Sequence, residues 1–174
     1  MPVPDPSVLK PLLGGRGSVS ILAPKPVGTE PRPPESGFPE LGAKLELQLV
    51  FTGFAAVKGA LYWATQYARD LGARITILAA QVVPYPLPLE KPPVDVRLLE
   101  RDLCALAAAQ PVETAIQIFL CRDAWETIRN ALPPESTVIV GGRKRWWWPK
   151  GEQRFAGLLR RDGHRVIFLN LQAA

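Results

Sequence analysis

The sequence is poor in residues that hold metals or act as nucleophiles: its 174 residues include one histidine and two cysteines. Cys104 and Cys121 lack the paired spacing that zinc and redox motifs need, so we expect both to be reduced and packed. No histidine lies close to Cys121 to activate its thiol. His164 stands where a strand is expected to begin. These features argue against a metal site and against an activated nucleophile.

Long apolar runs are also absent. No segment approaches the roughly 20 apolar residues that cross a bilayer, and the start of the sequence lacks a basic stretch followed by an apolar one. These two absences predict a cytoplasmic protein without a transmembrane segment. Lysine and arginine number 21 against 16 acidic residues, a net charge of +5, which predicts no specific nucleic-acid partner. The positive charge concentrates in 143–145 and at Arg154, Arg160, Arg161 and Arg165.

Residues 1–42 hold more than half of the chain's 19 prolines. Because proline lacks a backbone donor and fixes φ, we expect a disordered or extended tail here. Only Val19 to Ala23 could pair transiently as a strand. A plain linker and a peptide that docks in an aromatic groove remain alternative roles for this tail. The chain therefore divides into a proline-rich tail (1–42) and one domain (43–174).

From Lys44 onward, apolar strand-like runs alternate with segments of helical spacing. The expected strands cover 44–51, 74–83, 112–120, 137–140 and 164–171. The helices between them are expected to end at Gly72, Pro111, Pro133 and Gly163. Helix-length connections imply parallel strands with helices on both faces. We therefore predict an α/β fold, a three-layer α/β/α sandwich around a five-stranded parallel sheet.

Strands buried on both faces read as nearly continuous apolar runs, and such runs identify the expected core. Its candidate residues are Val50, Phe51, Ile77, Ile118, Val138, Ile139, Val166 and Ile167. Asp123 and Glu126 resemble an acid pair, but they also have the spacing of a capping box, which explains them without chemistry. The helix that they open is expected to turn Trp125, Ile128 and Leu132 inward.

The strand 137–140 ends at paired glycines and opens into a basic triplet, Gly141-Gly142-Arg143-Lys144-Arg145. In parallel α/β sheets, ligand crevices lie beyond the carboxyl ends of the strands, and Thr52-Gly53 follows the first strand in the same position. The triplet can pair with phosphate or carboxylate through charge-assisted hydrogen bonds. A solvated basic loop is the alternative. This end of the sheet is the candidate binding site.

Trp146-Trp147-Trp148 follows the basic triplet, and three adjacent indoles cannot all enter one core from a loop. We expect at least one of them to be exposed or to cover the crevice. A stacking platform for a base, a docking patch for a partner and an anchor on a membrane surface are possible roles. Packing of the triplet on the following helix is the structural alternative.

Residues 44–171 resemble a universal stress protein domain, which belongs to the adenine nucleotide α-hydrolase-like superfamily. The likeness lies in an apolar strand, an alanine-rich helix ending in Ala68-Arg69-Asp70-Leu71-Gly72-Ala73, and Ile75-Thr76-Ile77-Leu78. It continues in Trp125-Glu126-Thr127-Ile128, which leads to Val138-Ile139-Val140-Gly141-Gly142. The resemblance implies the strand order 3-2-1-4-5, and a homodimer formed through the last strand.

ATP-binding members of that family carry an acidic residue after strand one. After strand four they carry a motif of Gly, two residues, Gly, nine residues, Gly, then Ser or Thr. Here Thr52 and Gly53 occupy the first turn. Counting from Gly141 places Lys144, Arg154 and Phe155 at the later motif positions. Bulky residues there would obstruct the approach of a phosphate to the backbone amides.

Three functions follow as hypotheses. The first is a non-enzymatic, universal-stress-protein-like module that senses a ligand or binds a partner, without the usual ATP site and without a cofactor. The second is a degenerate binder of ATP or AMP that uses Arg143, Lys144 and Arg145. The third is a nucleotide hydrolase, although Thr52-Gly53-Phe54-Ala55-Ala56 is not the glycine- and serine-rich loop such enzymes need. A protein or an anionic ligand is the expected partner of the basic and tryptophan-rich loop.

Overall fold

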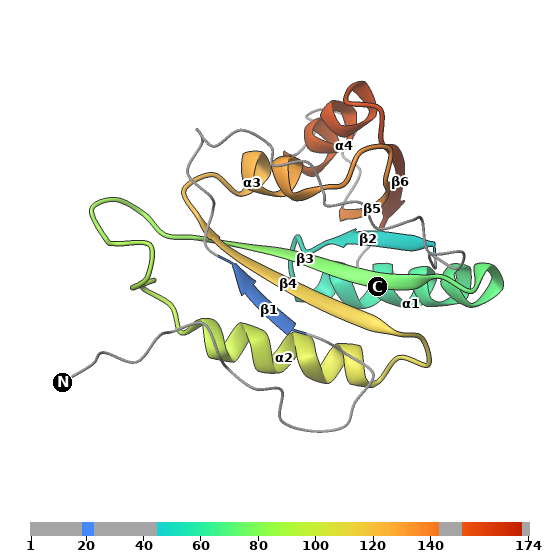
Figure 1. Cartoon of the computed structure of the whole chain (residues 1–174), viewed down its shortest axis with the longest axis horizontal. Coiled ribbons are helices and arrows are strands. Elements are labelled where there is room, and N and C mark those ends of the chain that lie inside the picture. The colour runs from blue at the N-terminus through green and yellow to red at the C-terminus, as the bar shows by residue number, and fades with distance from the viewer. Residues whose placement is uncertain (1–18, 23–44, 143–150, 172–174) are drawn as a thin grey trace, which may run out of the picture.

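The computed structural model describes residues 19–22, 45–142 and 151–171, and Figure 1 shows how their strands and helices are arranged. In chain order the elements are β1 Val19–Leu22, β2 Glu46–Val50, α1 Phe54–Leu71, β3 Arg74–Val82, α2 Val96–Ala108, β4 Thr114–Cys121, α3 Ala124–Ala131, β5 Thr137–Gly142, α4 Gly151–Arg161 and β6 Arg165–Asn170. None of the helices in these ranges is long and apolar enough to cross a membrane.

All strands of the sheet are parallel, in the order β1-β4-β3-β2-β5-β6. The five strands from β4 to β6 confirm the predicted parallel sheet and its order, 3-2-1-4-5 in the numbering of the domain. Strand β1 adds a sixth strand at the β4 edge. It is formed by Val19–Leu22, which lie in the only run of the proline-rich tail that the sequence allows to pair as a strand.

Helices cover both faces of the sheet, so the architecture is the predicted α/β/α sandwich (Figure 1). On one face, α1 and α2 pack on a cluster that includes Leu49, Ile77 and Ile118. On the other face, α3 and α4 pack on a second cluster that includes Val50 and Val140. Consecutive strand residues point to opposite faces, which is why Leu49 and Val50 belong to different clusters.

The predicted core holds for the central strands. Val50, Ile77, Ile118, Val138 and Ile139 are buried. Phe51, Val166 and Ile167 are half-buried, because Phe51 lies beyond the end of β2 and the other two lie on the edge strand β6.

Helix ends follow the signals in the sequence. Gly72 ends α1 in the left-handed conformation, at φ 63° and ψ 25°, and the amide of Ala73 donates to the carbonyl of Ala68 at 2.9 Å. Asp123 caps α3: its Oδ1 accepts a hydrogen bond from the amide of Glu126 at 2.9 Å. This cap confirms that local geometry explains the Asp123 carboxylate.

The cap makes a prediction about stability. Asp123→Ala removes the acceptor of the Glu126 amide and should lower the free energy of unfolding by about 1 kcal/mol, measured by urea denaturation. Asp123→Asn keeps an acceptor oxygen and should stay within a few tenths of a kcal/mol of the native chain. Equal losses in both variants would show that the charge of Asp123, rather than its cap, stabilises the fold.

Candidate functional site

The carboxyl ends of β2 and β5 lie side by side, with Val50 paired to Val140 in register. Thr52 follows β2, and its hydroxyl donates a hydrogen bond of 2.7 Å to the carbonyl of Gly141. Gly53 precedes α1 at φ 145°, a conformation that side-chain-bearing residues rarely adopt. The structure therefore places Thr52 and Gly53 beside the glycines of β5.

Gly141 is closely surrounded on the face that carries α1. A Cβ at this position would lie 3.0 Å from Cδ1 of Leu171, 3.1 Å from the carbonyl oxygen of Ala56 and 3.2 Å from Cβ of Ala60. Leu171 follows β6, and its amide donates to the carbonyl of Gly142 at 2.9 Å, which holds it beside the end of β5. The space above Gly141 is thus filled by protein atoms.

Gly142 is surrounded in the same way on the opposite face. A Cβ here would lie 3.2 Å from Cβ of Glu152 in α4 and 3.2 Å from Cζ of Phe168 in β6. A side chain at either glycine would therefore require the neighbouring atoms to shift. The basic triplet Arg143, Lys144 and Arg145 and the indoles of Trp146, Trp147 and Trp148 lie outside the described residues.

The two cysteines and the histidine are explained by burial and by packing contacts. Cys121 is buried at the end of β4, and burial raises the pKa of its thiol, against a smaller lowering by a hydrogen bond with Thr127. Burial likewise raises the pKa of Cys104. The Nδ1 atom of His164 lies 3.0 Å from the hydroxyl of Ser136, at the amino end of β6, and this contact ties the starts of β5 and β6 together. The described residues contain no group of three metal-ligating side chains.

Arg122 fixes the proline-rich connection between β3 and α2. Its guanidinium donates hydrogen bonds of 2.5 Å to the carbonyl of Val83 and 2.7 Å to that of Leu87. It also lies over the ring of Tyr85, 4.1 Å from the centroid. The sequence offered no pattern that singled out Arg122, because its partners are backbone carbonyls of a segment 35 or more residues away.

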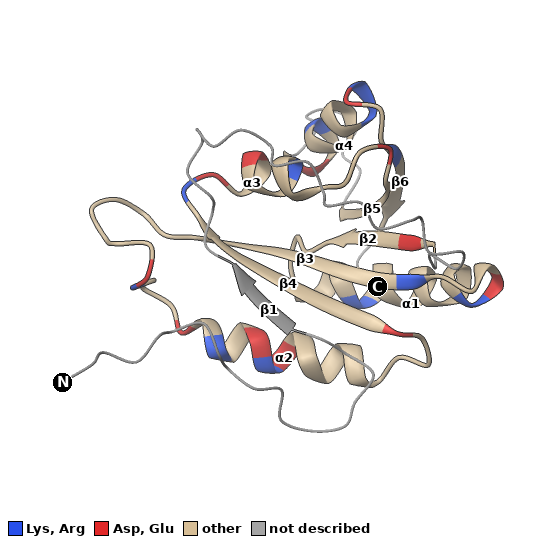
Figure 2. Cartoon of the chain, viewed as in Figure 1, with Lys and Arg blue, Asp and Glu red and all other residues tan. Residues whose placement is uncertain are grey.

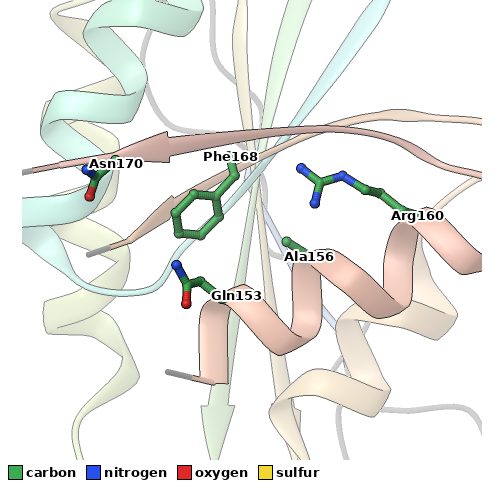
Figure 3. A pocket seen from close by; sticks show the side chains of 5 residues that line it. All are labelled: Gln153, Ala156, Arg160, Phe168 and Asn170. Carbon is green, nitrogen blue, oxygen red and sulfur yellow. The ribbon is translucent and has the colours of Figure 1, made fainter. Parts of the chain in front are cut away.

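A groove runs between β6 and α4 and encloses about 530 Å³ (Figure 3). Phe168 and Asn170 line it from the strand, and Gln153, Ala156 and Arg160 line it from the helix. Arg160 also donates to the carbonyl of Val166 at 3.3 Å. Sequence reasoning expected the last strand to offer an edge, but not the helix side chains beside it.

No family model and no curated protein matches the chain.

The packing around Gly141 can be tested by adding one carbon atom. Gly141→Ala should destabilise the protein by about 1–3 kcal/mol, because a Cβ forces Leu171 and α1 apart. Gly157→Ala is the matched control, since a Cβ there meets nothing within 4 Å, and it should stabilise α4 by about 0.5–1 kcal/mol.

The same change in a Leu171→Ala background should cost less, because one of the three close contacts is gone. Chemical denaturation of the four variants measures all of these effects. A Gly141→Ala protein as stable as the native chain would contradict the packing described above.

Proposed function

We propose that this chain is a universal-stress-protein-like module that binds a protein partner and does not use the usual ATP site of that family. The observation that carries the proposal is the contrast between two ends of the structure. Side chains occupy the space beside Gly141 and Gly142, whereas no strand of the described residues pairs with the outer edge of β6, and a groove lies beside it.

The filled end of β5 supports the non-enzymatic hypothesis. A phosphate that binds backbone amides needs to approach them closely, as bare glycines permit. Here Leu171 and Ala60 lie against Gly141, and Glu152 lies against Gly142. A nucleotide would have to displace these side chains to reach the two glycines. Anion binding by Arg143, Lys144 and Arg145 remains the alternative proposal.

The open edge of β6 supports partner binding. The backbone amides of Arg165 and Leu171 donate hydrogen bonds toward β5. The backbone groups of the odd-numbered residues of β6 therefore point toward β5, and those of the even-numbered residues point away from the sheet. Val166 and Phe168 therefore direct backbone groups away from β5, and no described strand pairs with that side. Unpaired edges of this kind accept an added strand through main-chain hydrogen bonds.

A second copy of the chain is the partner that we propose for this edge. In an antiparallel pairing with Phe168 opposite its counterpart, Val166 lies opposite Asn170. The two Arg165 residues then stand about 20 Å apart along the strands, so like charges are not brought together. The half-buried apolar side chains of β6 gain cover in the same step. Trp146, Trp147 and Trp148 are proposed to contribute further contacts to a partner.

Nucleotide binding is tested by titration calorimetry with ATP, ADP and AMP, with magnesium present and absent. We expect a dissociation constant of about 0.1 mM or weaker, because the bulky motif positions and the packed glycines oppose a phosphate site. Hydrolysis is followed in the same samples. Low-micromolar, magnesium-dependent binding that is lost in Arg143→Ala would support the alternative function and sink the proposed one.

Edge pairing is tested by sedimentation equilibrium. Val166→Pro removes an outward-facing amide without touching the ladder to β5, so dimers should weaken by tenfold or more while the helical circular dichroism is kept. Val166→Thr keeps the amide and the branched side chain and is the matched control. A chain that is monomeric at all concentrations, or a Pro variant that associates like the Thr variant, rules out this edge as the dimer interface.

A further inference from the structure

The outward surface of α4 carries cations around an apolar hollow. Phe155, Ala156 and Leu159 face the sheet and are buried. On the opposite side, Arg154, Gly157, Leu158 and Arg161 line an open hollow of about 360 Å³. Arg154 and Arg161 are separated by about 10 Å along the helix axis, and they flank the hollow at its two ends. This surface is distinct from the groove beside β6, which lies on another side of the helix.

The helical layer formed by α3 and α4 also carries exposed apolar side chains. Leu158 is 42% exposed and Trp125 of α3 is 36% exposed, although the sequence predicts an inward position for Trp125. The indole of Trp125 packs on Phe155, with ring centroids 4.6 Å apart, and it also lies against Gly151 at the start of α4. Its position is therefore fixed by α4, while part of the ring stays open to solvent.

Acidic side chains of the described residues form no ion pair with Arg154 or Arg161. Asp162 is paired with Arg129 of α3, which lowers the pKa of the aspartate. Figure 2 shows basic residues along α4 and acidic residues near both of its ends.

Helix stability explains only some of these arginines. Arg160 and Arg161 stand in the last turn of α4, where a positive charge interacts favourably with the helix dipole. Arg154 stands near the first turn, where the same dipole disfavours a cation. Neither the dipole nor an ion pair with a described residue holds the Arg154 guanidinium, so it can interact with an external anion.

We propose that the outer surface of α4, with Trp125 beside it, docks on an anionic lipid bilayer. Arginines attract acidic headgroups, and exposed Leu and Trp side chains enter the interfacial region. A lipid suits this hollow better than a nucleic acid does, because its lining beyond the two guanidinium groups is apolar. Recognition of a base would need polar groups or an open stacking face, and one side of the Trp125 ring is covered by α4.

The experiment is co-sedimentation of the full chain with vesicles. One set contains phosphatidylcholine alone, and the other contains about one third phosphatidylglycerol, which supplies the negative surface potential. We expect binding to the anionic vesicles only, and its loss when ionic strength rises from about 0.1 M to about 1 M, which shortens the Debye length from about 10 Å to about 3 Å. Equal binding to both vesicle types would overturn the proposal.

The variants are confined to α4, since the segment 143–150 could bind vesicles by itself. Arg154→Gln/Arg161→Gln should weaken partition into anionic vesicles by roughly 30-fold, at about fivefold for each arginine near the surface. Lys58→Gln/Arg69→Gln is the matched control: it removes the same charge from α1, on the opposite face of the sheet, and should bind like the native chain. Leu158→Gln keeps both arginines and should weaken binding to anionic vesicles at about 0.1 M ionic strength, because it removes the exposed apolar side chain that enters the interfacial region.

Three results overturn the inference. The first is native-like vesicle binding by the α4 double variant, which would place any lipid contact outside α4. The second is an equal loss of vesicle binding in the α1 control, which would show that the net charge of the protein, and not the surface of α4, determines binding. The third is retention of a labelled single-stranded oligonucleotide by the native chain, lost in the α4 double variant while vesicle binding is absent, which would assign the surface to nucleic acid. Sedimentation equilibrium of the same variants shows whether they still form the β6 dimer, so a loss of vesicle binding can be distinguished from a loss of dimerisation.

Discussion

The close approach of α1 to the end of β5 is the constraint on which this part of the structure depends. It requires small residues on both sides: a Cβ on Gly59 would lie 2.9 Å from Cδ2 of Leu171, and one on Gly141 would lie 3.1 Å from the carbonyl of Ala56. Leu171 fills the remaining space and links β6 to α1. Because an added Cβ would force these neighbours to shift, close packing gives the strand-end glycines a structural role that does not need a ligand.

Because of this packing, the carboxyl ends of β2 and β5 leave little space for a ligand, and the edge strand β6 becomes the better candidate for a binding surface. In open α/β sheets the crevice beyond the strand ends is the usual place for a small ligand, and here side chains from α1, α4 and β6 lie against the glycines of that crevice. Among the described residues, no strand pairs with the outward main-chain groups of Val166 and Phe168, and Arg160 of α4 lies beside them and donates to the carbonyl of Val166. These groups suit a polypeptide strand better than a nucleotide.

The fold could be predicted from the sequence because its elements are marked locally. The signals for strands and helix ends each act within a few residues: apolar runs, Gly72, Gly163 and the cap at Asp123. The strands and helix ends predicted from them are found in the structure. Trp125 was predicted to face inward but is partly exposed, since its exposure depends on how α3 meets Gly151 of α4. Arg122 and Leu171 were missed for the same reason: their partners are distant in sequence. The residues expected to bind a ligand at 143–148 lie outside the described ranges, so their role stays a prediction.

The two proposed surfaces are compatible because they use different sides of α4. The groove beside β6 uses Gln153, Ala156 and Arg160, whereas the hollow uses Arg154, Leu158 and Arg161. Residues opposite each other in antiparallel strands point to the same face of a sheet. Joining two β6 strands in this way therefore turns both α4 helices to the same side of a continuous sheet. A dimer would then present two basic hollows to one membrane, and the second contact would form at a high effective concentration. If both proposals hold, dimerisation through β6 would strengthen attachment through α4 without any new contact between the two surfaces.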